Sequence, residues 1–125
     1  MSARILIVED EETLRESLIR VLTKEGYDVN GADSSEAALR TIELRAYDMV
    51  ITDVMLPGLS GLELLKKCKL WNPDLVIIIM TAYATIEHAV EAVKSGAYDY
   101  LVKPITHDNL KAVISKALQD KRYLK

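Results

Sequence analysis

The stretch "MVITDVMLPGLSG", residues 49–61, joins a continuously apolar run to a loop rich in proline and glycine, with Asp53 between the two. A short, continuously apolar run is typical of a strand that is buried on both faces. Proline and glycine let the following loop turn sharply, so that backbone groups can approach a bound group closely. The stretch therefore predicts a buried strand that holds one carboxylate at its carboxyl end.

Short runs rich in β-branched residues recur along the chain, and helical patterns separate them. A last helix is expected from about Thr106 to the end of the chain. The expected strands are residues 5–8, 27–32, 48–52, 75–80 and 98–102. Apolar residues at the spacing of one helical face lie between them, at Leu14, Leu18, Val21 and Leu22, then Ala38, Leu39 and Ile42, then Leu64, Leu65 and Cys68, then Ile86, Ala89, Val90 and Val93.

The predicted helix ends agree with this alternation. Ser60 and Glu63 form a plausible capping box, and Gly26 and Gly96 stand where two helices should stop. Strict alternation of strands and helices predicts an α/β fold, in which a parallel sheet has helices on both faces. Every strand then ends at the same edge of the sheet, which is where such folds bind ligands.

Composition limits the classes of function that fit the chain. Its 125 residues suit one domain, and a formal net charge of -3 gives no electrostatic reason to expect direct binding of nucleic acid. The single Cys68 is expected to be a buried, reduced thiol, which suits a cytoplasmic protein. The beginning of the chain does not resemble a targeting segment, and the longest apolar run, "LVIIIM", is too short to span a bilayer. No membrane association is expected.

Polar residues follow the predicted strands at this edge: Glu9, Asp10, Asp53, Thr81 and Lys103. Three crowded carboxylates repel one another unless a cation neutralises them. Oxygen ligands favour Mg²⁺, whereas zinc would need a His and Cys cluster that the chain does not offer. His88 and His107 are read as ordinary surface residues of helices. An aspartate beside Mg²⁺ can attack a phosphoryl group and become an acyl phosphate, with an ammonium and a hydroxyl balancing the charge.

The motifs "ILIVEDEE", "DMVITDVMLPGLSGLELL", "IIMTAYA" and "GAYDYLVKPI" together resemble the receiver domain of two-component response regulators, over essentially the whole chain. The residues of these motifs are similar to those in receivers of the NtrC-like transcriptional activators. This resemblance implies a flavodoxin-like, doubly wound, five-stranded parallel sheet with five helices.

The resemblance also implies a role for each matching residue. Asp53 matches the phosphoacceptor, and Glu9 and Asp10 match the acidic pair, with Asp10 binding Mg²⁺ directly and Glu9 through water. Met55 would add its backbone carbonyl to the metal. Lys103 matches the lysine that pairs with the phosphoryl group, and Thr81 matches the switch hydroxyl. Tyr100 matches the switch aromatic, and Pro104 matches a proline that follows a cis peptide bond.

Two positions are candidates for setting the lifetime of the phosphoryl group. Met55 and Tyr83 each lie two residues after a site residue, where side chains should flank the path of an attacking water. A bulky apolar group and an aromatic ring exclude water instead of orienting it, so we expect slow dephosphorylation. The alternative is that both are merely exposed loop residues.

The resemblance implies a sensor histidine kinase as phosphoryl donor and a homodimer through the fourth helix, fifth strand and fifth helix. Residues 1–120 are expected to form the receiver, and 121–125 to begin a linker helix toward an output domain that contacts DNA. A frayed end of the last helix is the alternative.

Three other classes remain as rivals. A phosphohydrolase like the haloacid dehalogenases would need a second aspartate where Met55 stands. A flavodoxin-like binding module would need hydroxyls and amides in place of "EDEE". A pseudo-receiver that only mediates contacts would not need all five site residues.

Overall fold

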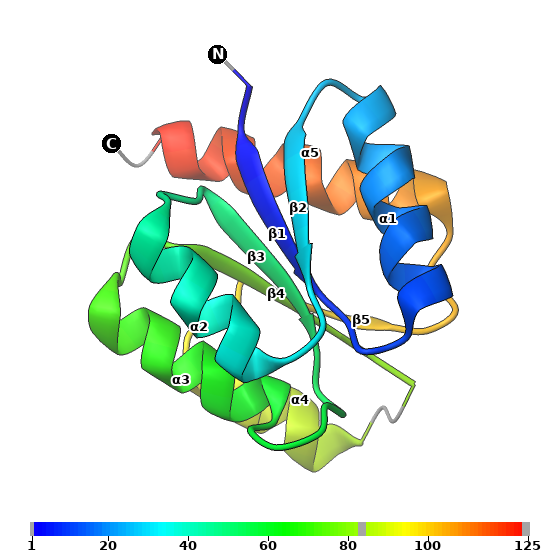
Figure 1. The fold of residues 1–125 in the computed structure, drawn as a ribbon. Coiled ribbons are helices and arrows are strands. Elements are labelled where there is room, and N and C mark those ends of the chain that lie inside the picture. Colours follow the sequence, from blue (N-terminus) through cyan, green and yellow to red (C-terminus); the bar gives the residue numbers. More distant parts are fainter. Residues whose placement is uncertain (1, 83–84, 124–125) are drawn as a thin grey trace.

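A computed structural model describes residues 2–82 and 85–123, and in that part of the chain strands and helices alternate strictly (Figure 1). All strand pairs are parallel, and the strand order is β2-β1-β3-β4-β5. The predicted α/β fold with a flavodoxin-like, doubly wound sheet is thereby confirmed. In chain order the elements are β1 (Arg4–Val8), α1 (Glu12–Lys24), β2 (Asp28–Ala32), α2 (Ser35–Leu44), β3 (Met49–Asp53), α3 (Gly61–Trp71), β4 (Val76–Thr81), α4 (Ile86–Lys94), β5 (Asp99–Val102) and α5 (His107–Tyr123).

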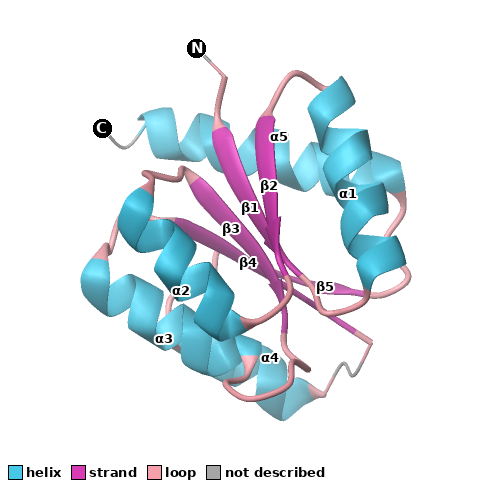
Figure 2. Ribbon diagram, in the orientation of Figure 1, coloured by secondary structure: helices cyan, strands magenta, loops and turns pink. Residues whose placement is uncertain are grey.

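The sheet lies between two layers of helices, with α1 and α5 on one face and α2, α3 and α4 on the other (Figures 1 and 2). Successive residues of a central strand point to opposite faces, so β1 sends Leu6 and Val8 toward α2 and α3, and Ile5 and Ile7 toward α1 and α5. β3 is buried along its whole length. The continuously apolar runs are therefore the strands covered on both faces, as expected.

The predicted helix signals are confirmed. The Ser60 hydroxyl accepts a hydrogen bond from the Glu63 N–H at 3.2 Å, and the Ser60 N–H donates to Glu63 Oε1 at 3.2 Å, which completes the capping box of α3. Gly26 and Gly96 follow α1 and α4 with φ of +93° and +102°, a conformation that disfavours any side chain. Cys68 is buried, and burial raises the pKa of its thiol to about 11.

Two strands extend one residue further than the sequence predicted. Asp53 is the last residue of β3 and lies opposite Met80, and Thr81 is the last residue of β4 and lies opposite Val102. The apolar pattern stops before these polar residues, but the ladder of backbone hydrogen bonds continues through them. Both side chains consequently project from regular, rigid strand ends.

α4 packs against the core through Ala92, which lies outside the apolar set that the spacing groups on one face of this helix. Ile86, Val90 and Val93 are 82%, 45% and 63% exposed, whereas Ala92 is fully buried. A small residue against the sheet lets the helix approach closely and leaves its larger apolar side chains facing outward. The interpretation of His88 as a surface residue was wrong, because His88 lies one turn before Ala92 and its buried Nδ1 has no hydrogen-bond partner among the described residues.

Within residues 2–82 and 85–123, none of the helices has the length and apolar character needed to cross a membrane.

Candidate functional site

The carboxyl ends of β1, β3 and β5 bring two carboxylates and one ammonium together. Lys103 Nζ lies 2.6 Å from Glu9 Oε1 and 2.5 Å from Asp53 Oδ2. The three residues come from positions up to 94 residues apart in the chain, so only the strand order brings them together. They lie beside the point between β1 and β3 where the strand order reverses, which is the usual ligand position in doubly wound sheets.

Glu9 is fixed in the protein interior directly after β1. Its residue is only 1% exposed, and its second carboxylate oxygen accepts a hydrogen bond from the Glu11 N–H at 3.2 Å. Burial raises the pKa of Glu9, and the hydrogen bond with Lys103 offsets part of that increase. The Glu9 carboxylate therefore positions the Lys103 ammonium together with Asp53.

Lys103 is positioned by its own backbone as well as by the two acids. Its N–H donates to the Thr81 carbonyl at 2.8 Å, which joins the ends of β4 and β5. The peptide bond between Lys103 and Pro104 is cis, as the resemblance implies. Burial alone would lower the pKa of Lys103, but its hydrogen bonds with Asp53 and Glu9 outweigh that effect and raise the pKa. The side chain is therefore a permanent ammonium between two carboxylates.

Asp53 is held by contacts to both of its carboxylate oxygens. Oδ1 accepts a hydrogen bond from the Met55 N–H at 2.9 Å, while Oδ2 contacts Lys103. The residue is 6% exposed, so its carboxylate sits just below the protein surface. Such an aspartate is held in one orientation and remains within reach of a small group arriving from solvent.

Asp10 borders this pair of acids, because its side chain shares a hydrogen bond with the Glu9 carboxyl group. It is exposed, and the described residues contain no group of three His, Cys, Asp or Glu side chains close enough to hold a metal ion. The available donors nevertheless have the chemistry of a hard-cation site, because Asp10, Asp53 and the backbone of Met55 offer only oxygen. The structure thus brings Glu9, Asp53 and Lys103 together and leaves Asp10 at the rim.

Thr81 and Tyr100 lie on the two neighbouring strands next to this cluster. Thr81 is fully buried at the end of β4, and Tyr100 is half-buried in β5, where it packs against the core on the α3 and α4 side. Burial raises the pKa of Tyr100, and a hydrogen bond with the Thr85 backbone opposes this. Because Thr85 is the N-cap of α4, Tyr100 connects β5 to the start of that helix.

The remaining predicted positions lie further out or outside the described residues. Tyr83 falls on residues 83–84, which the structure does not describe. The Met55 side chain is exposed beside Asp53, and His107 is exposed at the start of α5.

Two contributors to the site were not evident from sequence. Arg15 Nη1 donates to the Glu9 carbonyl at 2.9 Å and secures the turn after β1. The Gly61 N–H donates to the Val54 carbonyl at 2.9 Å, and a Cβ at this position would come within 2.0 Å of the Asp53 carbonyl oxygen. The sequence indicated only a sharp turn around Gly61, since close approach of two backbone segments leaves no local signal.

The cluster has the chemistry of an aspartyl phosphoacceptor on a doubly wound α/β fold. A buried strand end presents the Asp53 carboxylate, and the Lys103 ammonium contacts it directly. The family model of the response regulator receiver domain matches residues 5–115. The chain belongs to this family, and the resemblance to NtrC-like response regulators is confirmed by its relatives.

Two relatives show the degree of similarity. The chain is 43% identical over 114 residues to the transcriptional regulatory protein ZraR of Escherichia coli, and the match covers 91% of this chain and 26% of ZraR. It is 44% identical over 104 residues to the response regulator protein FleR of Pseudomonas aeruginosa, covering 83% of this chain and 22% of FleR. The chain thus spans about a quarter of the length of these relatives.

Solved structures confirm the fold. A CheY-like receiver domain protein from Methanospirillum hungatei superposes with a TM-score of 0.97 at 31% identity, over 100% of both chains. TrrA from Thermotoga maritima, solved with Mg²⁺ and beryllofluoride, has a TM-score of 0.85 at 36% identity over 92% of this chain and 98% of its own. The beryllofluoride-activated receiver domain dimer of NtrC4 has a TM-score of 0.90 at 31% identity, over 94% of this chain and 98% of its own.

Proposed function

We propose that this domain is a phosphorylation-activated switch in which Asp53 accepts a phosphoryl group from a sensor histidine kinase. The observation that supports it best is the contact of Lys103 Nζ with both Asp53 and Glu9. The Asp53 carboxylate forms the new bond to phosphorus, the donor's leaving group departs, and the Lys103 ammonium balances the charge on the transferred oxygens. Incubation with acetyl phosphate and Mg²⁺ should raise the intact mass by one phosphoryl group, and an unchanged mass would overturn the proposal.

We infer that Mg²⁺ supports this transfer. Asp10 and Asp53 would hold the ion together with the Met55 carbonyl, and Glu9 would contribute through water. The bound ion supplies positive charge next to the phosphoryl oxygens. The oxygen-only donor set supports this assignment, and so does the Mg²⁺ in the TrrA structure.

We infer further that Thr81 and Tyr100 read the phosphorylated state. The hydroxyl of Thr81 lies at the end of the strand next to β3, where a phosphoryl group on Asp53 would offer new acceptor oxygens. Tyr100 already connects β5 to the N-cap of α4 through Thr85. A shift at Thr81 would therefore change the position of α4 relative to β5.

We propose a homodimer through α4, β5 and α5. The NtrC4 receiver dimer supports dimerisation, and the exposed apolar residues of α4 support this face. We expect beryllofluoride with Mg²⁺ to shift the domain toward a dimer, and Val93→Glu to weaken that dimer at least about tenfold by placing an unpaired charge in the contact. Light scattering across a concentration series measures this effect.

The matched control is Leu70→Glu, because Leu70 is also an exposed apolar residue and lies on α3, outside the α4, β5 and α5 surface. It should dimerise like the wild-type domain. A wild-type domain that stays monomeric with beryllofluoride would contradict the proposed output.

Slow dephosphorylation is a further expectation of this function. The Met55 side chain is exposed next to the phosphoacceptor, where an asparagine could orient an attacking water. We expect Met55→Asn to shorten the acyl phosphate lifetime about tenfold or more, since positioned polar groups accelerate such steps by at least this factor. The lifetime is measured from the decay of the phosphorylated protein, followed by intact mass. Met55→Leu is the apolar control, and Tyr83→Glu is the corresponding change two residues after Thr81. An unchanged decay in Met55→Asn and Tyr83→Glu would contradict the expectation.

We propose that the domain regulates transcription as one part of a longer protein, in which residues from about 121 onward begin a linker to an output domain. The quarter-length match to ZraR and FleR supports this. DNA contact would then be indirect. The buried thiol of Cys68 agrees with a role in the reducing cytoplasm.

A further inference from the structure

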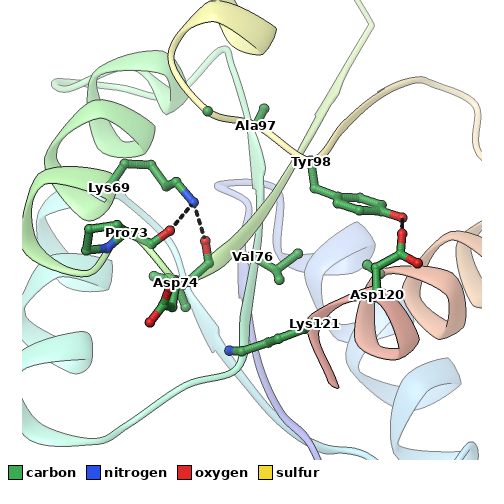
Figure 3. A pocket seen from close by; sticks show the side chains of 11 residues that line it. Lys69, Pro73, Asp74, Val76, Ala97, Tyr98, Asp120 and Lys121 are labelled. Carbon is green, nitrogen blue, oxygen red and sulfur yellow. Dashed lines mark hydrogen bonds between the residues drawn. The ribbon is translucent and has the colours of Figure 1, made fainter. Parts of the chain in front are cut away.

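β5 and the residue before it carry two tyrosines that reach in opposite directions. Tyr100 packs against the core on the α3 and α4 side and contacts the N-cap of α4. Tyr98 packs against the core on the α1 and α5 side, and its hydroxyl donates a hydrogen bond to Asp120 in the last turns of α5 (Figure 3). One short segment therefore contacts both helices of the proposed output surface.

The hydrogen bond between Tyr98 and Asp120 has its proton on the phenol at neutral pH. The Asp120 carboxylate raises the pKa of Tyr98 to about 12, so the phenol keeps the proton that it donates. The Tyr98 N–H also donates to the Ile77 carbonyl at 2.7 Å. Tyr98 is thus fixed to the sheet at its backbone and to α5 at its hydroxyl.

A cavity of about 620 Å³ separates the last turns of α5 from the loop between α3 and β4 (Figure 3). On its α3 side, Lys69 Nζ donates to the carbonyls of Pro73 and Leu75 at 2.6 and 2.9 Å, which fixes that loop. On its α5 side lie Ala117, Asp120 and Lys121. The end of α5 therefore has space beside it, and side-chain packing alone does not determine its position there.

A second polar contact holds the same turn of α5. Lys121 Nζ donates to the Asp48 carbonyl at 3.1 Å and lies 3.8 Å from its carboxylate. Asp48 directly precedes β3, the strand that ends at Asp53. Two consecutive residues of α5, Asp120 and Lys121, thus contact the residues directly before β5 and β3, and both line the cavity.

We propose that Tyr98 is a positioning residue of the switch and passes a change in β5 to the last turns of α5 through its hydrogen bond to Asp120. The inference rests on the phosphorylation switch proposed above. Movement of Tyr100 shifts β5, Tyr98 moves with the strand that it directly precedes, and the neighbouring cavity lets α5 follow without a clash. The last turns of α5 then take different positions in the two states.

The test compares amide chemical shifts of ¹⁵N-labelled protein with and without beryllofluoride and Mg²⁺. In the wild-type domain we expect shifts both around Asp53 and Thr81 and at residues 117–121. Tyr98→Phe should keep the shifts around Asp53 and Thr81 and reduce the shifts at residues 117–121 about fivefold, because one hydrogen bond biases a two-state equilibrium by roughly that factor. Neither Tyr98 nor Asp120 belongs to the phosphoryl site.

Variants at Asp120 separate a hydrogen bond from a charge effect. Asp120→Ala should reproduce the loss seen in Tyr98→Phe, whereas Asp120→Asn retains an acceptor oxygen and should restore most of the α5 response. Tyr47→Phe is the matched control, since the Tyr47 hydroxyl donates to Asn30 at 2.7 Å on the other side of the sheet. It should leave both groups of shifts unchanged.

The outcomes separate the two proposals. A wild-type domain without shifts at Asp53 and Thr81 would overturn the switch itself and the coupling with it. Normal shifts at Asp53 together with an undiminished α5 response in both Tyr98→Phe and Asp120→Ala would overturn only the coupling. If Asp120→Asn lost as much of the α5 response as Asp120→Ala, the proposed coupling would also be overturned, because the hydrogen bond would not then connect Tyr98 to α5.

Discussion

We expect Asp53→Asn to abolish the mass gain that acetyl phosphate and Mg²⁺ produce in the wild-type domain. The substitution keeps the shape of the side chain and an oxygen for the Met55 N–H, which now donates to Asp53 Oδ1 at 2.9 Å. It removes the nucleophilic carboxylate oxygen, because an amide oxygen is a poor nucleophile and carries no charge for Lys103 to balance. The effect on phosphorylation should therefore be complete, while the fold persists.

The control is Asp48→Asn, which changes the aspartate directly before the opposite end of β3. This variant should gain one phosphoryl group as the wild-type domain does. A mass gain in Asp53→Asn at the wild-type rate would show that another residue accepts the group. The proposed assignment of Asp53 would then be wrong.

The largest effect on stability is expected from Gly61→Ala. An added Cβ would lie 2.0 Å from the Asp53 carbonyl oxygen and 2.8 Å from its carbonyl carbon. These are backbone atoms of a buried strand end, so relief of the clash requires α3 and β3 to separate. We expect a loss of at least about 3 kcal/mol in the free energy of unfolding, the upper range for overpacking, measured by urea titration.

Gly31→Ala is the matched comparison within another strand. Its Cβ would meet Ile19 Cδ1 at 2.8 Å and Arg15 Cδ at 3.1 Å, both parts of flexible side chains that can rotate away. We expect a change below about 1 kcal/mol. Equal losses in the two variants would contradict the explanation by backbone contact at Gly61. Because the same contact positions Asp53, the remaining folded Gly61→Ala protein should also be phosphorylated more slowly.

Several elements of the fold were predictable because their signals are local. The buried run before Asp53, the capping box at Ser60 and the glycines after two helices each depend on residues close together in sequence. The order of the motifs then led to the receiver family. The strand limits at Asp53 and Thr81 were each one residue short, because hydropathy marks burial and not the end of backbone pairing.

The orientation of α4 was not predictable in this way. Its apolar spacing groups Ile86, Ala89, Val90 and Val93 on one helical face, yet the structure exposes three of them, Ile86, Val90 and Val93, and buries Ala92. A pattern of apolar residues cannot distinguish a face that packs inside the domain from one that is left to a partner.

The sequence by itself determined the alternation of strands and helices, the edge of the sheet on which polar residues gather, and the identity of Glu9, Asp53 and Lys103 as site candidates. Periodicity and capping are properties of neighbouring residues, so they can be recognised without a structure. Only the tertiary structure decided that Lys103 bridges both acids, that Asp10 remains at the rim, that Gly61 must lack a side chain, and that Tyr98 reaches α5. Those features depend on distances between segments far apart in the chain, which are set by how the strands and helices pack.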